Sequence, residues 1–358
     1  LIASQVILPM IDKLAGGETL EKKSSPQGNK QQFVAGISAE KQLKFGISKI
    51  LVITPRPFGL MGTPGTYYLV DAYGKHTDVK IISNDVSQHN VDIVYSPDNL
   101  SDLTKLKFGT RRCINEIRAI MESFCPEIVV IGNYSGWYKI IEPLKRDFPS
   151  VKYVLDVKTP LIITSSDESE REETQQASQA NAKLLDMIMA YSKNSILTWI
   201  SNWDGNTLIY PLGIRCSSFQ VRDLEITSKK CSKFVYVGSI HPLRKLDVLL
   251  NHIAALPEEL RQGVQFDFYG SGPASGDIKR IINDKNLQNI VFLKGCLNAK
   301  DLASTLTEYD AGIAWVPHEV YEYAPSLKLL EYFASGLVPI AMDTVAHKLY
   351  LEQGFHVE

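Results

Sequence analysis

The sequence predicts an α/β protein built from two Rossmann-like, doubly wound domains that face each other across a cleft. The chain has 358 residues, which is about twice the length of a typical domain. Short apolar runs rich in β-branched residues alternate with helical patterns along most of it. One segment, residues 211–232, interrupts this alternation. We therefore expect an N-terminal domain at 46–210, an inter-domain linker at 211–232 and a C-terminal domain at 233–358.

Residues 1–45 are predicted to be a leader and linker that precede the first domain. The opening LIASQVILPMI is apolar over 11 residues and has no basic stretch before it. A short helix left from a larger chain fits this pattern, with a signal-peptide remnant as the alternative. Residues 16–32 are polar and rich in Gly, Ser, Lys and Gln, as in a linker.

In the N-terminal half, a short apolar run indicates each strand, and apolar residues recurring with a 3.6-residue period indicate each helix. The predicted strands are 49–54, 79–83, 127–131, 152–155, 194–197 and 207–209, and the predicted helices are 66–73 and 109–124. Ser165–Lys183 is the most polar stretch. It favours a solvated surface helix or loop, with an acidic contact for a partner as the alternative.

The C-terminal half repeats the alternation. Its predicted strands are 234–237, 265–269, 290–293, 312–316 and 338–341, and its predicted helices are 246–255, 276–285, 301–307 and 326–334. Because all these strands are linked through helices, the sheet should be parallel. Its ligand should then bind outside the carboxyl ends of the strands.

Charge and cysteine content exclude several function classes. The 38 basic and 40 acidic residues give a net charge of −2, whereas a nucleic-acid binder should show a basic excess. The 5 cysteines lie far apart and form no C-x-x-C pair, so we expect no zinc site, no disulfide framework and a cytoplasmic location. No apolar run is long enough to span a membrane.

Two loops that follow strands carry features suited to a phosphate ester. After 49–54, PRPFGLMGTPGT places Gly62 and Gly65 just before a helix, where backbone N–H groups can approach an anion. A plain flexible loop is the alternative. After 234–237, Arg244 and Lys245 precede a helix and could clamp a diphosphate. Here the alternative is a pair of solvated cations.

The loop after 312–316 is the richest in candidate residues. Pro325 suits a first helical position, and the N–H groups of Ser326, Leu327 and Lys328 would form an anion cradle. Lys328 and Glu331 lie three residues apart on one helix face. They could contact a phosphate and ribose hydroxyls, or simply form an ion pair.

The remaining candidates lie at other strand ends. Gly238 and Gly270 open loops after two strands, and the amides of Cys296 and Leu297 could read the edge of a base. Asp156 ends a strand at the expected cleft, as an acceptor contact or as a structural cap. His241 and His318 lie in cleft-side loops and are more typical of ordinary polar loop residues.

Five segments of the C-terminal half together resemble the retaining glycosyltransferases of family four, which have the GT-B fold. In order, they are FVYVGSIHPLRKLDVLL, FDFYGSGP, NIVFLKG, YDAGIAWVP and APSLKLLEYFASGLVPIA. The N-terminal half resembles the family through KILVIT with its glycine loop, YVLDVKTP and YPLGI. Compared with this family, the second domain ends early, as in an incomplete chain.

The resemblance implies transfer of a sugar from a nucleotide diphosphate-sugar, with retention and without a metal or other cofactor. The acceptor would be a glycan, a lipid-linked glycan or a protein-linked glycan. Arg244 occupies the position of the family's diphosphate-binding lysine, and Lys245 one where glycine is common. Ser239 stands where the family often has an arginine. The enzyme would be cytoplasmic, with peripheral association with the inner face of a membrane as one way to reach a lipid-linked acceptor.

The resemblance also assigns the carboxylates of the site. Glu331 matches the ribose-binding second glutamate of the family's paired motif, whereas Tyr323 stands in place of the first. The neighbouring Glu322, together with Asp156, is therefore the catalytic candidate. The departure at Tyr323 leaves an alternative function, a catalytically weak nucleotide-sugar-binding subunit that supports a partner glycosyltransferase. A nucleotide-sugar epimerase is a third alternative, but its acids and histidines cannot be identified.

Overall fold

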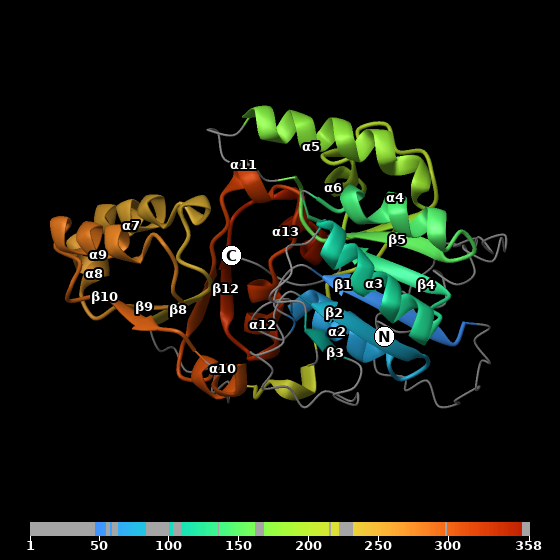
Figure 1. The fold of residues 1–358 in the computed structure, drawn as a ribbon. Helices are drawn as coiled ribbons and strands as arrows, with labels where there is room; N and C mark the ends of the chain where they lie inside the picture. Colours follow the sequence, from blue (N-terminus) through green and yellow to red (C-terminus); the bar gives the residue numbers. More distant parts are fainter. Residues whose placement is uncertain are drawn as a thin grey trace, which may run out of the picture.

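The computed structural model describes residues 47–54, 58, 64–83, 100–102, 109–134, 136–161, 168–214, 216–221, 232–297 and 299–352. Two parallel sheets form two α/β lobes side by side (Figure 1), which confirms the predicted fold class. The predicted leader at 1–45 and Gly62 of the glycine loop lie outside the described residues. Among those described, no helix has the length and apolar character to cross a membrane.

The first lobe is built on a sheet with the order β3-β2-β1-β4-β5-β6-β7, in which all neighbouring strands are parallel. The strands are β1 (Lys49–Thr54), β2 (Asp78–Ser83), β3 (Leu100–Asp102), β4 (Ile128–Gly132), β5 (Lys152–Val157), β6 (Met187–Ala190) and β7 (Thr207–Ile209). Because the chain order reverses at β1, the loops after β1 and β4 diverge there. This divergence opens a crevice at the carboxyl edge of the sheet.

Helices cover both faces of this sheet. They are α2 (Pro64–Tyr73), α3 (Arg111–Phe124), α4 (Tyr138–Asp147), α5 (Glu168–Asn181) and α6 (Lys193–Leu197), with a 3₁₀ turn at Ala182–Leu184. Val70 and Tyr73 of α2 pack with one set of strand side chains, and Ile117 of α3 and Ile141 of α4 pack with the other. The alternation of strand side chains between two faces thus gives two apolar layers.

One predicted strand is wrong. Residues 194–197 are expected to be extended but lie in α6, because the Ser192 hydroxyl accepts the Ser195 N–H at 3.1 Å and caps a helical turn. The strand between β5 and the edge strand β7 is instead β6, MIMA, whose four residues are fully buried. The polar stretch 165–183 is helical over Glu168–Asn181, with only Thr174 and Ser178 buried, as a surface helix requires.

The second lobe has a sheet of the order β10-β9-β8-β11-β12, again entirely parallel. Its strands are β8 (Lys233–Val237), β9 (Gln265–Tyr269), β10 (Val291–Gly295), β11 (Ala311–Ala314) and β12 (Val338–Ala341). Its helices are α7 (Leu246–Ala255), α8 (Glu258–Arg261), α9 (Ser275–Asp284), α10 (Ala299–Leu306), α11 (His318–Tyr321), α12 (Leu327–Ala334) and α13 (Val345–Glu352). Two 3₁₀ turns, η5 (Cys216–Ser218) and η6 (Pro242–Arg244), precede α7.

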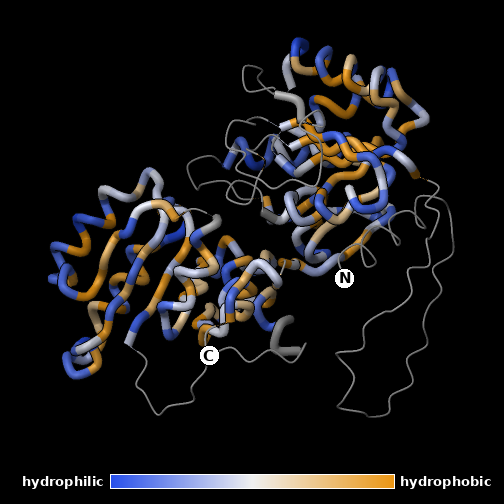
Figure 2. The backbone as a smooth tube through the Cα atoms, turned by 90° about the horizontal axis from the view of Figure 1, so that it is seen from below, coloured by the Kyte–Doolittle hydropathy of each residue, from blue (hydrophilic) through white to orange (hydrophobic). Residues whose placement is uncertain are grey.

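The apolar residues of both lobes lie in and against the sheets. Figure 2 shows orange segments within each lobe and blue segments on the outer helices. In the second lobe, α7 and α9 pack on one face through Leu250 and Ile278. Leu306 of α10 and Leu329 of α12 pack on the other. This packing holds in place the helices whose ends lie around the crevice.

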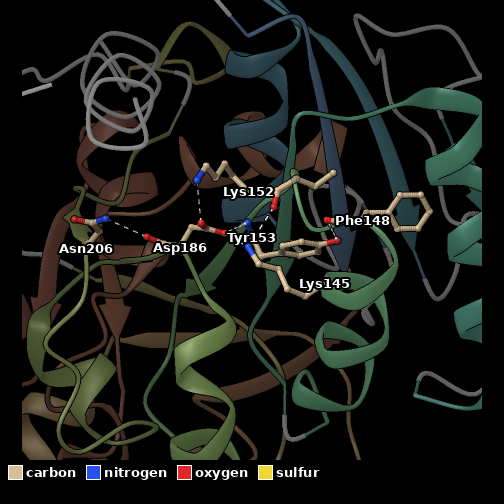
Figure 3. Close-up of polar contacts among 7 residues, drawn as sticks. Lys145, Phe148, Lys152, Tyr153, Asp186 and Asn206 are labelled. Carbon is tan, nitrogen blue, oxygen red and sulfur yellow. Dashed lines mark hydrogen bonds and ion pairs between the residues drawn. The ribbon is translucent and has the colours of Figure 1, made fainter. Parts of the chain in front are cut away.

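A polar cluster anchors the amino ends of β5 and β6 (Figure 3). The Asp186 carboxylate accepts from Lys145 Nζ at 2.7 Å, from the Tyr153 N–H at 2.9 Å and from Lys152 Nζ at 3.2 Å, while the Asp186 carbonyl accepts from Asn206. Partial burial opposes ionisation of Asp186, but the hydrogen bond from Lys145 outweighs it, so the pKa of this carboxyl is lowered. Since this cluster lies at the amino ends of the strands, it stabilises the lobe away from the crevice.

The two lobes are joined by hydrogen bonds near the crevice. The hydroxyls of Ser192 and Ser195, at the start of α6, each lie 3.2 Å from the Tyr323 carbonyl and donate to it. Tyr323 lies between α11 and α12. The first lobe therefore holds the loop that precedes α12.

Candidate functional site

A cavity of about 500 Å³ lies between the two lobes, within the size range of small-molecule sites. The first lobe contributes Tyr68 and Thr159, and the segment between the lobes contributes Ser218 and Phe219. The second lobe supplies the rest of the lining, including seven of the residues proposed from the sequence. These seven are Gly238, Arg244, Leu297, Ser326, Leu327, Lys328 and Glu331.

The turn after β8 separates the two adjacent cations. His241 Nδ1 accepts the Leu243 N–H at 3.2 Å, which starts the 3₁₀ turn η6. Lys245 then adopts a left-handed conformation with φ 45° and ψ 45°. Arg244 lines the cavity, whereas Lys245 Nζ lies outside the lining and pairs with Glu319 at 3.1 Å. Glycine adopts this left-handed backbone most readily, in line with the glycine that the resemblance implies at this position.

Arg244 is held by an aromatic ring rather than by a carboxylate. Its guanidinium carbon lies 4.4 Å from the centroid of the Tyr321 ring, and its Nε lies 3.4 Å from Ser239 Oγ. Its carbonyl accepts from the Trp315 indole at 2.9 Å. Within the described part of the chain, Arg244 makes no ion pair, so its charge is available to a ligand.

The start of α12 presents N–H groups to the same cavity. Ser326 is the N-cap with extended backbone, but its side chain makes no capping hydrogen bond. Pro325 precedes the cap and is not the first helical residue, so the helix begins one residue later than expected, at Leu327. Ser326, Leu327 and Lys328 all line the cavity. The first N–H groups of a helix have no partner within it, and they favour an anion.

Lys328 and Glu331 lie in the cavity without forming the ion pair that their spacing allows. Lys328 Nζ lies 5.3 Å from the centroid of the Tyr236 ring. Burial lowers the pKa of Lys328 to about 7, and the positive charge of Arg244 adds to the shift. Burial also raises the pKa of Glu331 to about 7, although Lys328 opposes this. An anion beside Lys328 would restore its charge.

Two glycines allow the loops after β8 and β9 to approach closely. A Cβ on Gly238 would lie 2.9 Å from the Tyr236 hydroxyl and 3.4 Å from Lys328 Nζ. A Cβ on Gly270, whose φ is +149°, would lie 1.9 Å from the Gly238 carbonyl oxygen. Gly270 does not line the cavity. It acts behind the cavity wall, by letting the β9 loop support the β8 loop.

The loop after β10 contributes one of its two candidate residues. Leu297 lines the cavity. Cys296 is exposed and outside the lining, and its thiol lies 3.0 Å from Ser271 Oγ in the loop after β9. The structure thus brings Leu297 to the site and places Cys296 in the contact between two loops.

Glu322 does not face the cavity in this structure. Its Oε1 accepts the Val345 N–H at the start of α13 at 3.3 Å, and its Oε2 lies 2.7 Å from His318 Nε2. Its carbonyl also accepts the Ala346 N–H at 3.0 Å. The carboxylate expected to act in catalysis is therefore engaged in a contact between α11 and α13.

Asp156 and Gly65 lie together in the first lobe, behind the cavity wall. Asp156 is 1% exposed, accepts from the Tyr210 hydroxyl at 2.6 Å and forms an ion pair with Lys158. A Cβ on Gly65 would lie 2.5 Å from the Tyr191 hydroxyl. This placement matches the structural alternative for Asp156, because a buried carboxylate needs such partners.

Sequence reasoning missed several residues that line the cavity, among them Tyr68, Thr159, Phe219 and Tyr321. Thr159 follows a predicted strand, so the rule about carboxyl ends could have found it. Phe219 also left a signal, because it is the large apolar residue in the otherwise small and polar run CSSFQ. Tyr68 and Tyr321 are in helices next to the predicted loops, and no local pattern marks them.

The arrangement is suited to an elongated, anionic ligand with an apolar part. Arg244, Lys328 and the N-terminus of α12 provide positive charge, and Glu331 provides a hydrogen-bond acceptor. Phe219, Leu297 and Leu302 provide apolar contacts. Such a combination fits a sugar nucleotide or a related diphosphate ester.

Comparison with known families finds a match in the second lobe. Residues 231–358 match the model of the family described as "Glycosyl transferases group 1". A poly(ribitol-phosphate) alpha-N-acetylglucosaminyltransferase from Staphylococcus aureus (strain COL) is 30% identical over 82 residues, which cover 21% of this chain and 16% of that protein. The chain thus aligns with about a sixth of that relative's length.

Solved structures share the arrangement of both lobes. A sucrose-phosphate synthase from Thermosynechococcus elongatus has a TM-score of 0.64 at 15% identity, covering 83% of this chain and 82% of that one. The pneumococcal O-GlcNAc transferase GtfA, in complex with UDP and GlcNAc, has a TM-score of 0.60 at 12% identity, covering 84% of each chain. At these identities the likeness shows the fold.

Proposed function

We propose that the chain transfers a sugar from a nucleotide diphosphate-sugar to a carbohydrate acceptor, because residues 231–358 match the model of the group 1 glycosyltransferases and the chain has a two-lobed GT-B fold. One observation carries this proposal. Arg244 and Lys328 share the cavity between the lobes with the N-terminus of α12, and neither forms an ion pair within the described residues. Unpaired cations that are partly removed from water need an anion.

The diphosphate of the donor is the anion that this geometry suits. Each charge-assisted hydrogen bond from Arg244 or Lys328 would contribute about 1.5–3 kcal/mol. Negative charge grows on the diphosphate as the bond to the sugar breaks, so the same groups stabilise the transition state more than the ground state. Since these cations and N–H groups already neutralise the leaving group, we propose that no metal is required.

Retention of the anomeric configuration follows from the proposed route of the proton. The bond between the anomeric carbon and the phosphate oxygen breaks, and the acceptor hydroxyl oxygen bonds to the same face of that carbon. The departing phosphate oxygen takes the proton of the hydroxyl. Among the described residues that line the cavity, Glu331 is the single carboxylate, so a route that needs no protein base suits this site.

The acceptor is proposed to be a glycan, free or linked to a lipid or a protein. The names of the compared proteins point this way, since one acts on poly(ribitol-phosphate) and another is bound to UDP and GlcNAc. Uridine diphosphate-sugars are therefore the first donors to test. A cytoplasmic location is part of the proposal, and contact with the inner face of a membrane is added for a lipid-linked acceptor.

The test combines binding with turnover. Thermal denaturation is measured with UDP, ADP, GDP and their sugars, because a ligand that binds the native state raises the melting temperature. Lys328→Ala should abolish most of the shift, whereas Lys279→Ala, on the exposed side of α9, should not change it. Release of nucleoside diphosphate that requires a glycan acceptor and is unaffected by a metal chelator would then show metal-independent transfer. No shift with any of these ligands would refute the proposal.

A second candidate is a nucleotide-sugar-binding subunit with little activity of its own. The position of Glu322 favours it, because its carboxylate contacts His318 and the start of α13 and not the cavity. Tight donor binding without release of the nucleoside diphosphate, with a range of glycan acceptors, would support this candidate over the enzyme.

A further inference from the structure

The segment that connects the two lobes brings an aromatic ring into the cavity. Phe219 follows the 3₁₀ turn Cys216–Ser218, and its N–H donates to the Cys216 carbonyl at 3.0 Å. Cys216, Ser217, Ser218 and Gln220 are exposed, and Phe219 is partly buried. The turn therefore directs the Phe219 ring inward, next to Ser218 at the cavity wall, while Cys216, Ser217 and Gln220 are exposed.

Phe219 belongs to the apolar part of the cavity. It packs with the hydrophobic cluster between the second sheet and helices α10 and α12, which also includes Val237 and Leu302. Leu297, from the loop after β10, lines the same cavity. Figure 1 shows the short yellow helix before Phe219 next to α10, in agreement with these contacts.

The apolar and the charged parts of the cavity lie at different positions along the second sheet. Arg244, Lys328 and Glu331 come from the turn after β8 and from α12, near the middle of the sheet order β10-β9-β8-β11-β12. Leu297 follows β10, which is the edge strand. A ligand whose phosphates contact Arg244 and Lys328 would therefore extend toward the β10 loop, where Leu297 and Leu302 are.

We propose that Phe219 stacks on the base of the nucleotide and is a base-binding residue of the donor site. This inference rests on the proposed function, since it assumes a nucleoside diphosphate in the cavity. Every base has a flat π-face, and aromatic stacking contributes to binding without requiring hydrogen bonds. Because Phe219 lies in the connecting segment, the described part of that segment around Phe219 belongs to the donor site.

The test separates the base from the phosphates. We would measure by calorimetry the binding of UDP, ADP, GDP and inorganic pyrophosphate to the full chain and to Phe219→Leu, which keeps an apolar side chain but removes the ring. Loss of stacking should weaken the best nucleotide by at least about fivefold, with pyrophosphate affinity unchanged. Phe292→Leu is the matched control, because Phe292 is 38% exposed on β10 and does not line the cavity.

A second variant guards against a change in folding. Phe219→Trp keeps an aromatic face, so it should bind the nucleotide about as well as the natural chain. Its fluorescence should change with nucleotide and not with pyrophosphate. Equal weakening of nucleotide and pyrophosphate in Phe219→Leu, or unchanged nucleotide affinity, would overturn the assignment alone. Failure of the natural chain to bind any of the three nucleotides would overturn the proposed function with it.

Discussion

Affinity for a nucleoside diphosphate should fall as the pH rises above neutrality, because Lys328 must be charged to hold a phosphate. Burial lowers the pKa of Lys328 to about 7 in the free protein. A bound diphosphate favours the charged amine and raises this pKa again. At a pH between the pKa of Lys328 in the free protein and its pKa in the complex, binding takes up a proton. A rise in pH within this range therefore weakens binding.

The size of the effect follows from the fraction of charged lysine. With a pKa of about 7, about half of the Lys328 amines carry a proton at pH 7, and about 3% at pH 8.5. If the bound lysine stays charged over this interval, the dissociation constant should rise about 16-fold, or about 1.6 kcal/mol. The terminal phosphate of the ligand is already ionised over most of this interval, so it contributes little.

Calorimetric titrations of UDP at several pH values, in buffers of different ionisation enthalpy, measure both the affinity and the proton uptake. Lys328→Arg provides the decisive comparison, because arginine stays charged and should remove the pH dependence. Glu331→Gln should keep the dependence and move it to lower pH, since the Glu331 carboxylate raises the pKa of Lys328. A dissociation constant that does not change with pH, or a dependence that persists in Lys328→Arg, would refute the reasoning.

Two further predictions concern residues on either side of the cavity wall. Arg244→Ala should weaken UDP binding by at least about tenfold, whereas Lys245→Ala should have a much smaller effect, because Lys245 pairs with Glu319 outside the cavity; equal losses in calorimetry would contradict this placement. Asp156→Asn should reduce the free energy of unfolding in urea by about 3 kcal/mol, since it leaves Lys158 buried without its counter-charge. The loss should shrink as the pH rises, because burial favours the neutral amine of Lys158, and a loss that does not depend on pH would count against the ion pair.

Most of the fold could be predicted because buried parallel strands leave a simple signature. KILVIT and QFDFY become β1 and β9 with the expected bounds. The strand β6 was missed since MIMA contains one β-branched residue and lies next to a stretch that mimics a strand. In that stretch, the hydrogen bond from the Ser195 N–H to the Ser192 hydroxyl caps a helical turn and favours a helix over a strand. Capping contacts of this kind depend on geometry that composition does not reveal.

The charged part of the site was predictable for a different reason. Arg244, Lys328 and Glu331 lie in segments that follow the carboxyl ends of strands. The rule that ligands bind at this end of a parallel sheet brings these three residues together. It cannot separate Arg244 from Lys245, since the left-handed backbone of Lys245 directs neighbouring side chains differently. Nor can it place Phe219, which lines the cavity although it follows no strand directly.

The contacts of the loop before α12 show why Glu322, one position before Tyr323, does not replace the missing carboxylate. Two adjacent residues hold the start of this loop: the Tyr323 carbonyl accepts from Ser192 and Ser195 of the first lobe, and Glu322 contacts the start of α13 through its carboxylate and its carbonyl. Turning Glu322 toward the cavity would break these contacts. Of the described residues that line the cavity, two are cations and one is a carboxylate. This excess of positive charge favours an anionic ligand. Catalysis then depends on the groups that stabilise the diphosphate as it leaves the sugar.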